Sequence, residues 1–300
     1  VEGFLTMFRE CTLLNVEEVL SKFFFQAEDG IRDEAQHISA PPRPPVFCPG
    51  CPHAASFYEL KITTAKARIK PIFSGDIGCY SLGINPPFNE QDVLTNMGSS
   101  IGLGMGIFRG TGGREFIVAI IGDSTFFHAG LPALVDAVYN KAPMLVIVMD
   151  NRFTAMTGGQ PSPTQAIDIA AVAKAIGVKY VYTIDPFNVK EAEAILSDAL
   201  GKVKGGELAL VVMRRACALE ASRGRGSLIV KFAVDPNACR ACGICYNLIA
   251  CPAIIRLNDG KASIDAASCV GCSVCAQVCP YDAIRPLGNA KEWLSKWGEI

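Results

Sequence analysis

Eight cysteines near the carboxyl end of the chain are spaced in a way that few folds accommodate. A C-x-x-C-x-x-C run is followed by a Cys-Pro pair, and a second such run is followed by another. The eight residues are Cys239, Cys242, Cys245, Cys251, Cys269, Cys272, Cys275 and Cys279. The chain has 13 cysteines and no secretory signal at its start, so we expect reduced thiols in a cytoplasmic protein rather than disulfides. Clustered reduced thiols indicate metal binding.

The spacing is that of bacterial ferredoxins with two [4Fe–4S] clusters, in which the fourth cysteine of each run binds the other cluster. We therefore expect cluster 1 on Cys239, Cys242, Cys245 and Cys279, and cluster 2 on Cys269, Cys272, Cys275 and Cys251. Thiolates are the soft ligands that iron in such clusters prefers. Five residues, YNLIA, separate Cys245 from Cys251 where the common pattern has fewer, so we expect a local loop there. A zinc module is the alternative.

Upstream of this module, apolar segments alternate with amphipathic ones. Buried strands are expected at residues 70–77, 115–123, 143–151, 179–184 and 208–214, and helices at residues 99–109, 126–140, 167–176 and 188–203. Near-continuous apolar strands separated by helices predict an α/β domain whose parallel sheet is covered by helices on both faces. The cysteine-rich module that follows is predicted to be a small α+β domain.

Composition divides the chain into five segments. We expect a leader and linker in residues 1–45, an α/β domain in residues 46–218, a linker in residues 219–230, a ferredoxin domain in residues 231–288 and a tail in residues 289–300. Residues 23–33, FFFQAEDGIRD, resemble the translation of a sequencing adapter. We interpret them as non-native, with an ordinary polar loop as the alternative, and exclude them from fold reasoning.

Charge and hydropathy exclude two classes of partner. The formal net charge of −1 gives no electrostatic signature of binding to nucleic acid or to an anionic membrane. No apolar run approaches the ~20 residues that a membrane-spanning helix needs. We therefore expect neither nucleic acid nor membrane as a partner.

Polar residues follow two neighbouring strands of the predicted sheet. Gly122-Asp123-Ser124 ends one strand and Asp150-Asn151 ends the next, which resembles the thiamine-diphosphate motif of G-D-G followed by an asparagine pair. Ser124 replaces the second glycine of that motif, and Asp150 replaces the first asparagine. The carboxyl ends of parallel strands meet at the ligand-binding edge of a sheet, and Mg²⁺ bridges oxygen ligands to a diphosphate. We expect Mg²⁺ on the side chains of Asp123 and Asn151 and on the backbone carbonyl of Phe153.

Further contacts to the cofactor are expected from turns at the same edge. The helix that begins near Ser124 and Thr125 directs its amino terminus towards the diphosphate, next to Gly122. Two glycine-rich turns, residues 75–83 and 97–106, place Gly78, Gly98 and Ser99 there as well. Glycine spacing alone is weak support for a phosphate-binding loop. The frame of strand, helix and strand is what favours the thiamine-diphosphate interpretation.

Four further cysteines lie in the α/β domain, namely Cys48, Cys51, Cys79 and Cys217. The segments that carry them and their neighbours include FCPGCPHAAS, SGDIGCYSLG, GDSTFFHAGLPAL, VYNKAP and MDNRFTAMTGGQ. With these segments the chain resembles the thiamine-binding part of 2-oxoacid:ferredoxin oxidoreductases. Within that superfamily it is most similar to the carboxyl-terminal half of the α subunits of indolepyruvate ferredoxin oxidoreductases. The resemblance covers about residues 41–286.

The resemblance implies a third cluster, on Cys48, Cys51, Cys79 and Cys217, near the thiazolium ring. A zinc site and buried free thiols are the alternatives. It also implies that His53 and His128 lie near the thiazolium or the substrate and transfer protons there, although each histidine fits a structural role equally well. The implied reaction is the oxidative decarboxylation of an aryl 2-oxoacid to an acyl-CoA and CO₂. Coenzyme A accepts the acyl group, and electrons pass through the clusters to external ferredoxin.

Thiamine enzymes also need a glutamate that is hydrogen-bonded to the aminopyrimidine ring. The chain has no second α/β half that supplies one, so we expect a pyrimidine-binding half or a second subunit as partner, with the active site at their interface. Two rival interpretations remain at this point. One is a non-catalytic electron-transfer subunit, which absence of bound thiamine diphosphate would favour. The other is a non-redox thiamine decarboxylase or synthase, which would leave the ferredoxin cysteines without a role.

Overall fold

The computed structural model describes residues 45–226 and 229–298. The predictions for residues 1–44, including the interpretation of residues 23–33, lie outside the described residues. Residues 46–300 form one compact unit, and all that follows concerns this unit. Among the described residues, no helix is long and apolar enough to cross a membrane.

The centre of the unit is a five-stranded parallel sheet, as the sequence predicts. Its strands, in spatial order, are β1 (Ile72–Ser74), β2 (Ile117–Gly122), β3 (Leu145–Asp150), β7 (Ala209–Arg214) and β6 (Tyr180–Ile184). Every pairing in this sheet is parallel. β2 and β3 are buried along their whole length, which explains their continuous apolar sequences.

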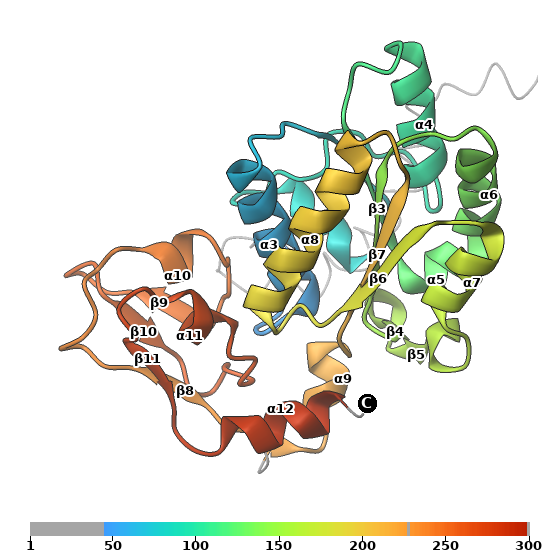
Figure 1. The fold of residues 1–300 in the computed structure, drawn as a ribbon. Coiled ribbons are helices and arrows are strands. Elements are labelled where there is room, and N and C mark those ends of the chain that lie inside the picture. The colour runs from blue at the N-terminus through green and yellow to red at the C-terminus, as the bar shows by residue number, and fades with distance from the viewer. Residues whose placement is uncertain (1–44, 227–228, 299–300) are drawn as a thin grey trace, which may run out of the picture. The chain divides into compact units, whose positions relative to one another are not determined.

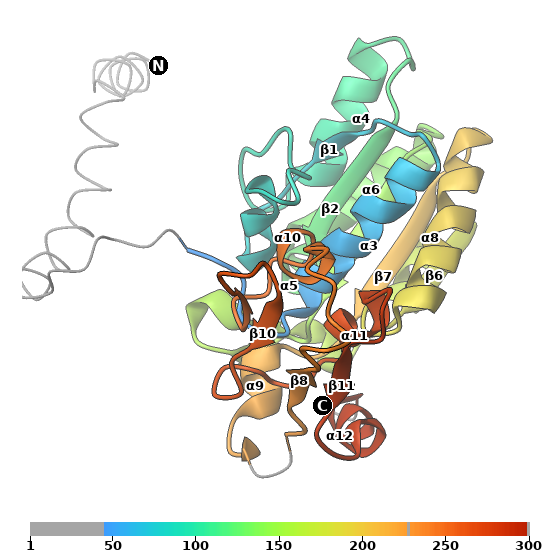
Figure 2. The ribbon, with the colours of Figure 1, turned by 90° about the vertical axis from the view of Figure 1, so that its left-hand side faces the viewer.

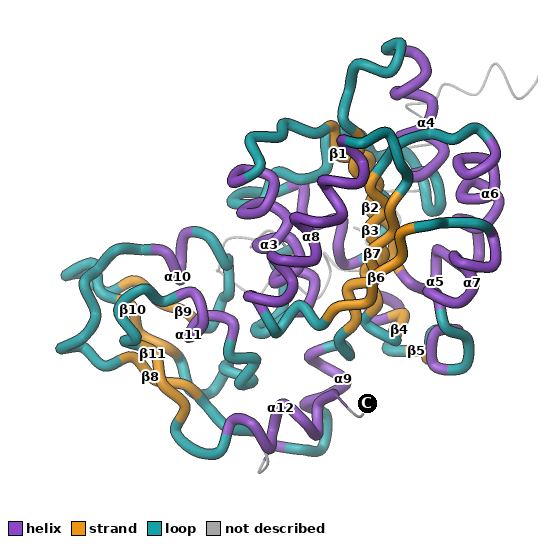
Figure 3. Tube along the Cα trace, in the orientation of Figure 1, coloured by secondary structure: helices purple, strands orange, loops and turns teal. Residues whose placement is uncertain are grey.

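Helices cover both faces of the sheet (Figure 3). On one face lie α3 (Pro52–Lys66) and α8 (Val189–Lys204), and on the other lie α4 (Ser100–Gly110), α6 (Leu131–Tyr139) and α7 (Ile169–Ile176). Successive residues of β3 point to opposite faces of the sheet. Ile147 packs in the core beneath α3 and α8, and Val148 packs in the core beneath α4, α6 and α7. The predicted fold class of a parallel sheet between helical layers is confirmed.

One helix, α3, is absent from the sequence prediction. Its first residue is Pro52, directly after Cys51, and it continues to Lys66. Its first nine residues are all buried, because α3 packs against the sheet, against α8 and against the turn after β1. A helix that is buried on most sides has no polar stripe, so its sequence shows no helical periodicity.

Glu59 of α3 is fully buried, and neither of its carboxylate oxygens has a hydrogen-bond partner among the described residues. Burial raises the pKa of Glu59 well above its usual value, and the nearby carboxylates of Asp185 and Glu193 raise it further. Above a pKa of about 4.3 the unfolded chain releases this proton while the folded protein retains it. Stability should therefore fall with rising pH, by up to about 1.4 kcal/mol per pH unit until the folded-state pKa is reached.

We therefore expect Glu59→Gln to raise the unfolding temperature, and the gain over the wild type to grow between pH 5 and pH 8. Thermal unfolding of both proteins across this range measures it. Glu207→Gln is the matched control, because Glu207 is partly exposed and pairs with Lys179. A gain that does not change with pH would contradict the assignment of a buried, protonated Glu59.

The segments between the main elements are short. After β2 the chain turns directly into α5 (Asp123–Thr125), a π-helical turn (Phe126–Gly130) and α6. The remaining short elements of the domain are η1 (Cys79–Ile84), β4 (Phe153–Thr154), η3 (Ala155–Thr157), β5 (Gln160–Pro161) and η4 (Pro163–Gln165). β4 and β5 pair antiparallel and form a small hairpin at the carboxyl edge of the sheet.

The cysteine-rich module has two strand pairs and two short helices (Figure 1). The elements are β8 (Phe232–Val234), α10 (Ile244–Asn247), β9 (Ile254–Arg256), β10 (Ala262–Ile264), α11 (Val274–Val278) and β11 (Ile284–Pro286). β8 pairs antiparallel with β11, and β9 with β10. The module is thus the small α+β domain that the repeated cysteine pattern predicts.

Two further helices connect the module to the sheet domain. α9 (Ala218–Ser222) follows β7, and α12 (Ala290–Gly298) follows β11. Both tryptophans of the chain lie in α12 and are buried, and the indole N–H of Trp297 donates to the Ala216 carbonyl at 3.0 Å. The side-chain amide of Gln277 in α11 bridges the module to the start of α8, since it donates to the Phe187 carbonyl at 2.7 Å. The module and the sheet domain therefore share one packed interface.

Candidate cofactor sites

A pocket lies at the carboxyl edge of the sheet, where β2 and β3 end. It is lined by nine of the predicted site residues: His53, Gly78, Cys79, Gly122, Asp123, Ser124, Thr125, Asn151 and Phe153. β2 and β3 are adjacent and parallel, so the residues that follow them meet at the same edge. Gly98, Ser99 and His128 do not line this pocket. His128 is exposed on the π-helical turn, and its proton-transfer role stays a prediction.

The helix that follows β2 begins earlier than the sequence pattern indicates. The apolar spacing predicts a helix over residues 126–140, but helical backbone starts at Asp123 and continues through the π-helical turn to Tyr139. Asp123 is buried among polar groups at the pocket, so it adds nothing to an apolar pattern. A π-helical turn inside an α-helix is frequent at functional sites.

Asp123 shares its buried surroundings with a second carboxylate. Its side chain accepts hydrogen bonds from the Ser124 backbone N–H at 2.7 Å and from the Thr164 hydroxyl at 3.3 Å. Burial raises the pKa of Asp123 to about 7, and the nearby Asp150 carboxylate raises it too. Asp150 is itself neutralised by Arg214, whose Nε lies 2.6 Å from the carboxylate.

A divalent cation fits this donor set. Two buried carboxyl groups close together oppose each other's ionisation, and a bound cation removes that cost. The amide oxygen of Asn151 adds a neutral oxygen, and its position is fixed by the Phe153 backbone N–H at 3.0 Å. Oxygen donors of this kind suit Mg²⁺. The assignment of Mg²⁺ to Asp123, Asn151 and Phe153 remains a prediction.

His53 lies on the other side of Asn151. The Asn151 amide nitrogen is 3.2 Å from His53 Nε2, so Nε2 is the acceptor and the ring proton is assigned to Nδ1. Burial lowers the pKa of His53 to about 4, which keeps the imidazole neutral at physiological pH. The lowered pKa makes this imidazole a weak base, so its role in proton transfer stays a prediction.

Tyr80 is a pocket residue that the sequence interpretation missed. Its ring is 5.7 Å from the His53 ring in an edge-on arrangement, and its hydroxyl donates to the Ile77 carbonyl at 2.9 Å. The ring occupies the space that a Cβ on Gly78 or Gly122 would need, at 2.4 Å and 2.5 Å respectively. These two glycines are therefore required for the packing of Tyr80 as well as for any contact with a cofactor.

Asp76 is the second residue that was missed, although it lies in the segment SGDIGC. Its buried carboxylate accepts from the Gly98 backbone N–H at 2.8 Å and from the Ser100 backbone N–H at 3.3 Å. This ties the two glycine-rich turns together and fixes Gly98 in its left-handed conformation, with φ of +89°. The signal in the sequence that could have identified Asp76 is an aspartate just after a strand, next to a glycine-rich turn.

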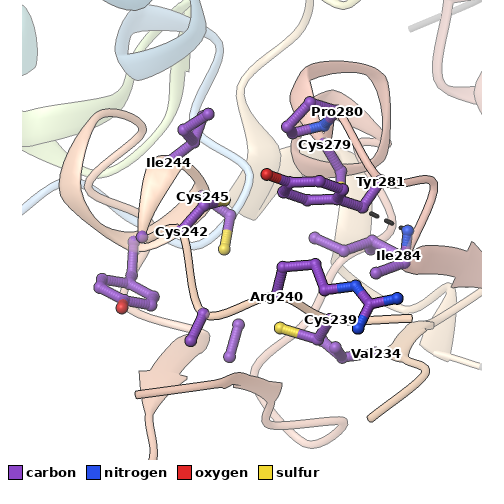
Figure 4. A pocket seen from close by; sticks show the side chains of 15 residues that line it. Val234, Cys239, Arg240, Cys242, Ile244, Cys245, Cys279, Pro280, Tyr281 and Ile284 are labelled. Carbon is purple, nitrogen blue, oxygen red and sulfur yellow. Dashed lines mark hydrogen bonds between the residues drawn. The ribbon is translucent and has the colours of Figure 1, made fainter. Parts of the chain in front are cut away.

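The cysteines of the module surround two separate pockets. Those predicted to bind cluster 1, namely Cys239, Cys242, Cys245 and Cys279, line the pocket in Figure 4. Burial raises the pKa of Cys245 to about 11, and the neighbouring thiols of Cys242, Cys279 and Cys239 contribute. A second pocket is lined by Cys251, Cys269, Cys272 and Cys275. Each set of four therefore shares one pocket, in the crossed combination that the sequence predicts.

The five-residue gap does not displace Cys251 from its group. Burial raises the pKa of Cys272 to about 12, and Cys251 is the first of the neighbouring thiols that raise it further. The gap residues include Ile249, which is buried. The extra length is therefore accommodated as a packed segment between α10 and Cys251.

The four cysteines of the sheet domain also lie near one another. Burial raises the pKa values of Cys48 and Cys79, and each is raised further by the Cys217 thiol. The thiols of Cys48 and Cys217 both raise the pKa of Cys51. Cys79 in addition lines the pocket that contains Asp123. These four cysteines, Cys48, Cys51, Cys79 and Cys217, are called the third cysteine group below. The group thus adjoins the predicted thiamine-diphosphate pocket.

In the described residues, no three His, Cys, Asp or Glu side chains already stand at the distances of a bound metal ion. In a [4Fe–4S] cluster each of the four cysteines binds a different iron, so its ligands lie farther apart than those of a single ion. The ligand assignments stay predictions, supported by the shared pockets.

Comparisons with known proteins agree with both halves of the structure. Residues 76–213 match the family described as thiamine pyrophosphate enzyme, C-terminal TPP binding domain, and residues 262–285 match the 4Fe-4S binding domain. The fold is similar to 2-oxoglutarate:ferredoxin oxidoreductase from Magnetococcus marinus, with a TM-score of 0.50 and 20% identity over 59% of this chain and 66% of that one. The chain is thus a thiamine-diphosphate-binding domain joined to a 4Fe-4S ferredoxin-type domain.

Two curated relatives share more of the chain's sequence. Indolepyruvate oxidoreductase subunit IorA of Methanothermobacter marburgensis is 41% identical over 87% of this chain and 43% of its own length. The subunit of the same name from Thermococcus kodakarensis is 41% identical over 93% of this chain and 47% of its own length. Over most of its length the chain is thus similar to curated indolepyruvate oxidoreductase subunits IorA, as its motifs predict. It spans about half the length of the curated relatives it matches.

Proposed function

We propose that the chain is the thiamine- and cluster-binding part of an enzyme that oxidatively decarboxylates aryl 2-oxoacids of the indolepyruvate type. The 2-oxoacid, coenzyme A and two oxidised ferredoxins give an acyl-CoA, CO₂, two reduced ferredoxins and a proton. One observation carries the proposal: Cys79, of the third cysteine group, lines the same pocket as Asp123 and Asn151. A carbon centre oxidised in this pocket would lie next to an electron acceptor.

When bound, thiamine diphosphate supplies the carbanion nucleophile and the electron sink. Asp123, Asn151 and the Phe153 carbonyl would hold Mg²⁺ against the diphosphate. Gly78, Gly122, Ser124 and Thr125 would contact the cofactor at the pocket wall, and Gly98 and Ser99 would support it from the turn that Asp76 fixes. His53, neutral and hydrogen-bonded to Asn151, would hold that side chain at the pocket wall. Proton transfer by His53 would require Nε2 to release the Asn151 amide, because Nδ1 carries the ring proton.

The rest of the active site would come from a pyrimidine-binding half or a second subunit. The relatives are about twice as long as this chain, which leaves room for such a half. It would supply the glutamate that the aminopyrimidine ring needs, so the active site would form at an interface. External ferredoxin would then accept electrons from the module.

Iron, acid-labile sulfide and thiamine diphosphate measured on anaerobically purified protein test the proposal. We expect about twelve iron atoms per chain, for three four-iron clusters, and thiamine diphosphate retained when the partner half is present. About eight iron atoms would confine the clusters to the module and leave Cys48, Cys51, Cys79 and Cys217 with another role. Failure to bind thiamine diphosphate even with the partner would instead indicate a non-catalytic electron-transfer subunit.

A further inference from the structure

The turn between Cys48 and Cys51 belongs to the sheet domain, yet it completes a pocket of the ferredoxin module. Gly50 of this turn lines the pocket that contains Cys251, Cys269, Cys272 and Cys275. It also lines a neighbouring pocket, which has Cys48 and Cys51 among its residues together with Cys251, Cys272 and Cys275. Gly50 is therefore the residue between the two groups of cysteines.

The approach at Gly50 is too close for any side chain. A Cβ at this position would lie 2.3 Å from Val270 Cγ2 and 3.3 Å from Cys272 Cβ. The backbone φ of Gly50 is +64°, a conformation that residues with a side chain rarely adopt. The contact thus excludes a side chain here, and the backbone conformation adds strain to any residue other than glycine.

The same turn also lies beside a second predicted ligand of cluster 2, because the Gly50 backbone N–H is a hydrogen-bonding neighbour of the Cys251 thiol. Backbone N–H groups that approach cysteine sulfur tune an attached cluster. A residue of the Cys48–Cys51 turn therefore contacts a predicted ligand of cluster 2.

On the module side, the five-residue segment before Cys251 takes part in the same contact. Ile249, within the gap, is 5% exposed and lines the second of these pockets together with Ala54 and Ala55 of α3. By contrast, the pocket of cluster 1 is lined only by residues 234–284. Among the described residues, the sheet domain thus lines the pocket of cluster 2 but not that of cluster 1.

We propose that Gly50 is the positioning residue for electron transfer between the third cysteine group and cluster 2. Because Gly50 has no side chain, the two cluster sites approach each other across a single turn of backbone. Electrons from the thiamine pocket would enter the module at cluster 2 and leave from cluster 1, where Cys242 is exposed. This inference rests on the proposed function, since it needs clusters at both sites.

The test uses Gly50→Ala in the full chain with its partner half, purified anaerobically and reduced with dithionite. Electron paramagnetic resonance reports the magnetic interaction between neighbouring reduced clusters, and iron content reports whether each cluster is present. We expect the interaction between cluster 2 and the third cluster to be lost or weakened at unchanged iron content. Gly50→Ala/Val270→Ala removes Val270 Cγ2, the atom nearest the added Cβ, and should restore the interaction.

Gly112→Ala is the matched control. Gly112 has a φ of +67° and no atom within 4 Å of the position of an added Cβ, so the variant carries the backbone strain without a contact. An undiminished interaction in Gly50→Ala at full iron content would overturn the proposal. So would a loss that Val270→Ala does not reverse, because the close contact at Gly50 would then not be its cause. About eight iron atoms in the wild type would instead refute the third cluster of the proposed function, before any substitution is made.

Discussion

Asp123→Ala is expected to abolish Mg²⁺-dependent binding of thiamine diphosphate while the iron–sulfur absorbance stays unchanged. Changes to groups that merely orient a metal ligand typically cost about 10- to 100-fold in metal affinity, and loss of a charged ligand should cost at least as much. Asp123 lies at the end of β2, whereas the cluster 1 pocket is lined only by residues 234–284. Titration of the cofactor with and without Mg²⁺, followed by calorimetry, measures the loss.

Two companion variants separate binding from folding. Asp123→Asn keeps the oxygen that accepts from Ser124 but removes the charge that faces Asp150. It should weaken cofactor binding without lowering the unfolding temperature of the cofactor-free protein, because the carboxylate repulsion is removed. Asp136→Ala is the control, since Asp136 is an exposed carboxylate on α6. Unaltered cofactor affinity in Asp123→Ala would show that Asp123 is not a ligand of the metal.

The sheet and the ferredoxin module could be predicted from the sequence because each has a local signature. Buried parallel strands are continuously apolar, and cluster ligands recur at fixed spacing. α3 had neither signature: it is buried on most sides, and its sequence shows no period. Recognition of α3 requires knowledge of what packs around it.

The pocket at the sheet edge could be predicted only in part, for a related reason. Residues that end strands, such as Asp123 and Asn151, are visible in the sequence as polar breaks after apolar runs. Asp76 acts across 22 residues of chain on the Gly98 backbone, and Tyr80 fills space that two glycines leave empty. Contacts of this kind depend on how turns meet in space, which spacing along the chain does not encode.

The tail shows the same limit, because the sequence alone assigns no role to its two tryptophans. Trp293 donates its indole N–H to the Val270 carbonyl at 2.9 Å, in the turn that carries two predicted ligands of cluster 2. Trp297 donates to the Ala216 carbonyl, next to Cys217 of the third cysteine group. α12 therefore connects the backbone beside two predicted cluster sites.

Trp297→Ala is accordingly expected to destabilise the protein by about 3–5 kcal/mol, the usual cost of truncating a large buried aromatic residue. The Trp297 ring is fully buried and lies 4.8 Å from the Phe187 ring, so its removal leaves a cavity between α12 and the sheet domain. It also leaves the Ala216 carbonyl without its donor. Thermal unfolding of the anaerobic, iron-loaded protein measures the loss.

Two further variants on the same helix serve as comparisons for Trp297→Ala. Trp297→Phe keeps most of the aromatic volume but loses the N–H. The lost hydrogen bond should lower the free energy of unfolding by about 1 kcal/mol, in addition to the cost of the smaller ring. Lys296→Ala removes a side chain that is partly exposed and pairs with Glu292 on α12 itself, and such surface changes usually stay within about 0.5 kcal/mol. If α12 fastens the module to the sheet domain, Trp297→Ala should also increase hydrogen exchange in the Cys48–Cys51 turn, where the two meet. Equal unfolding temperatures for Trp297→Ala and Lys296→Ala would mean that Gln277 and Gly50 hold the interface without α12.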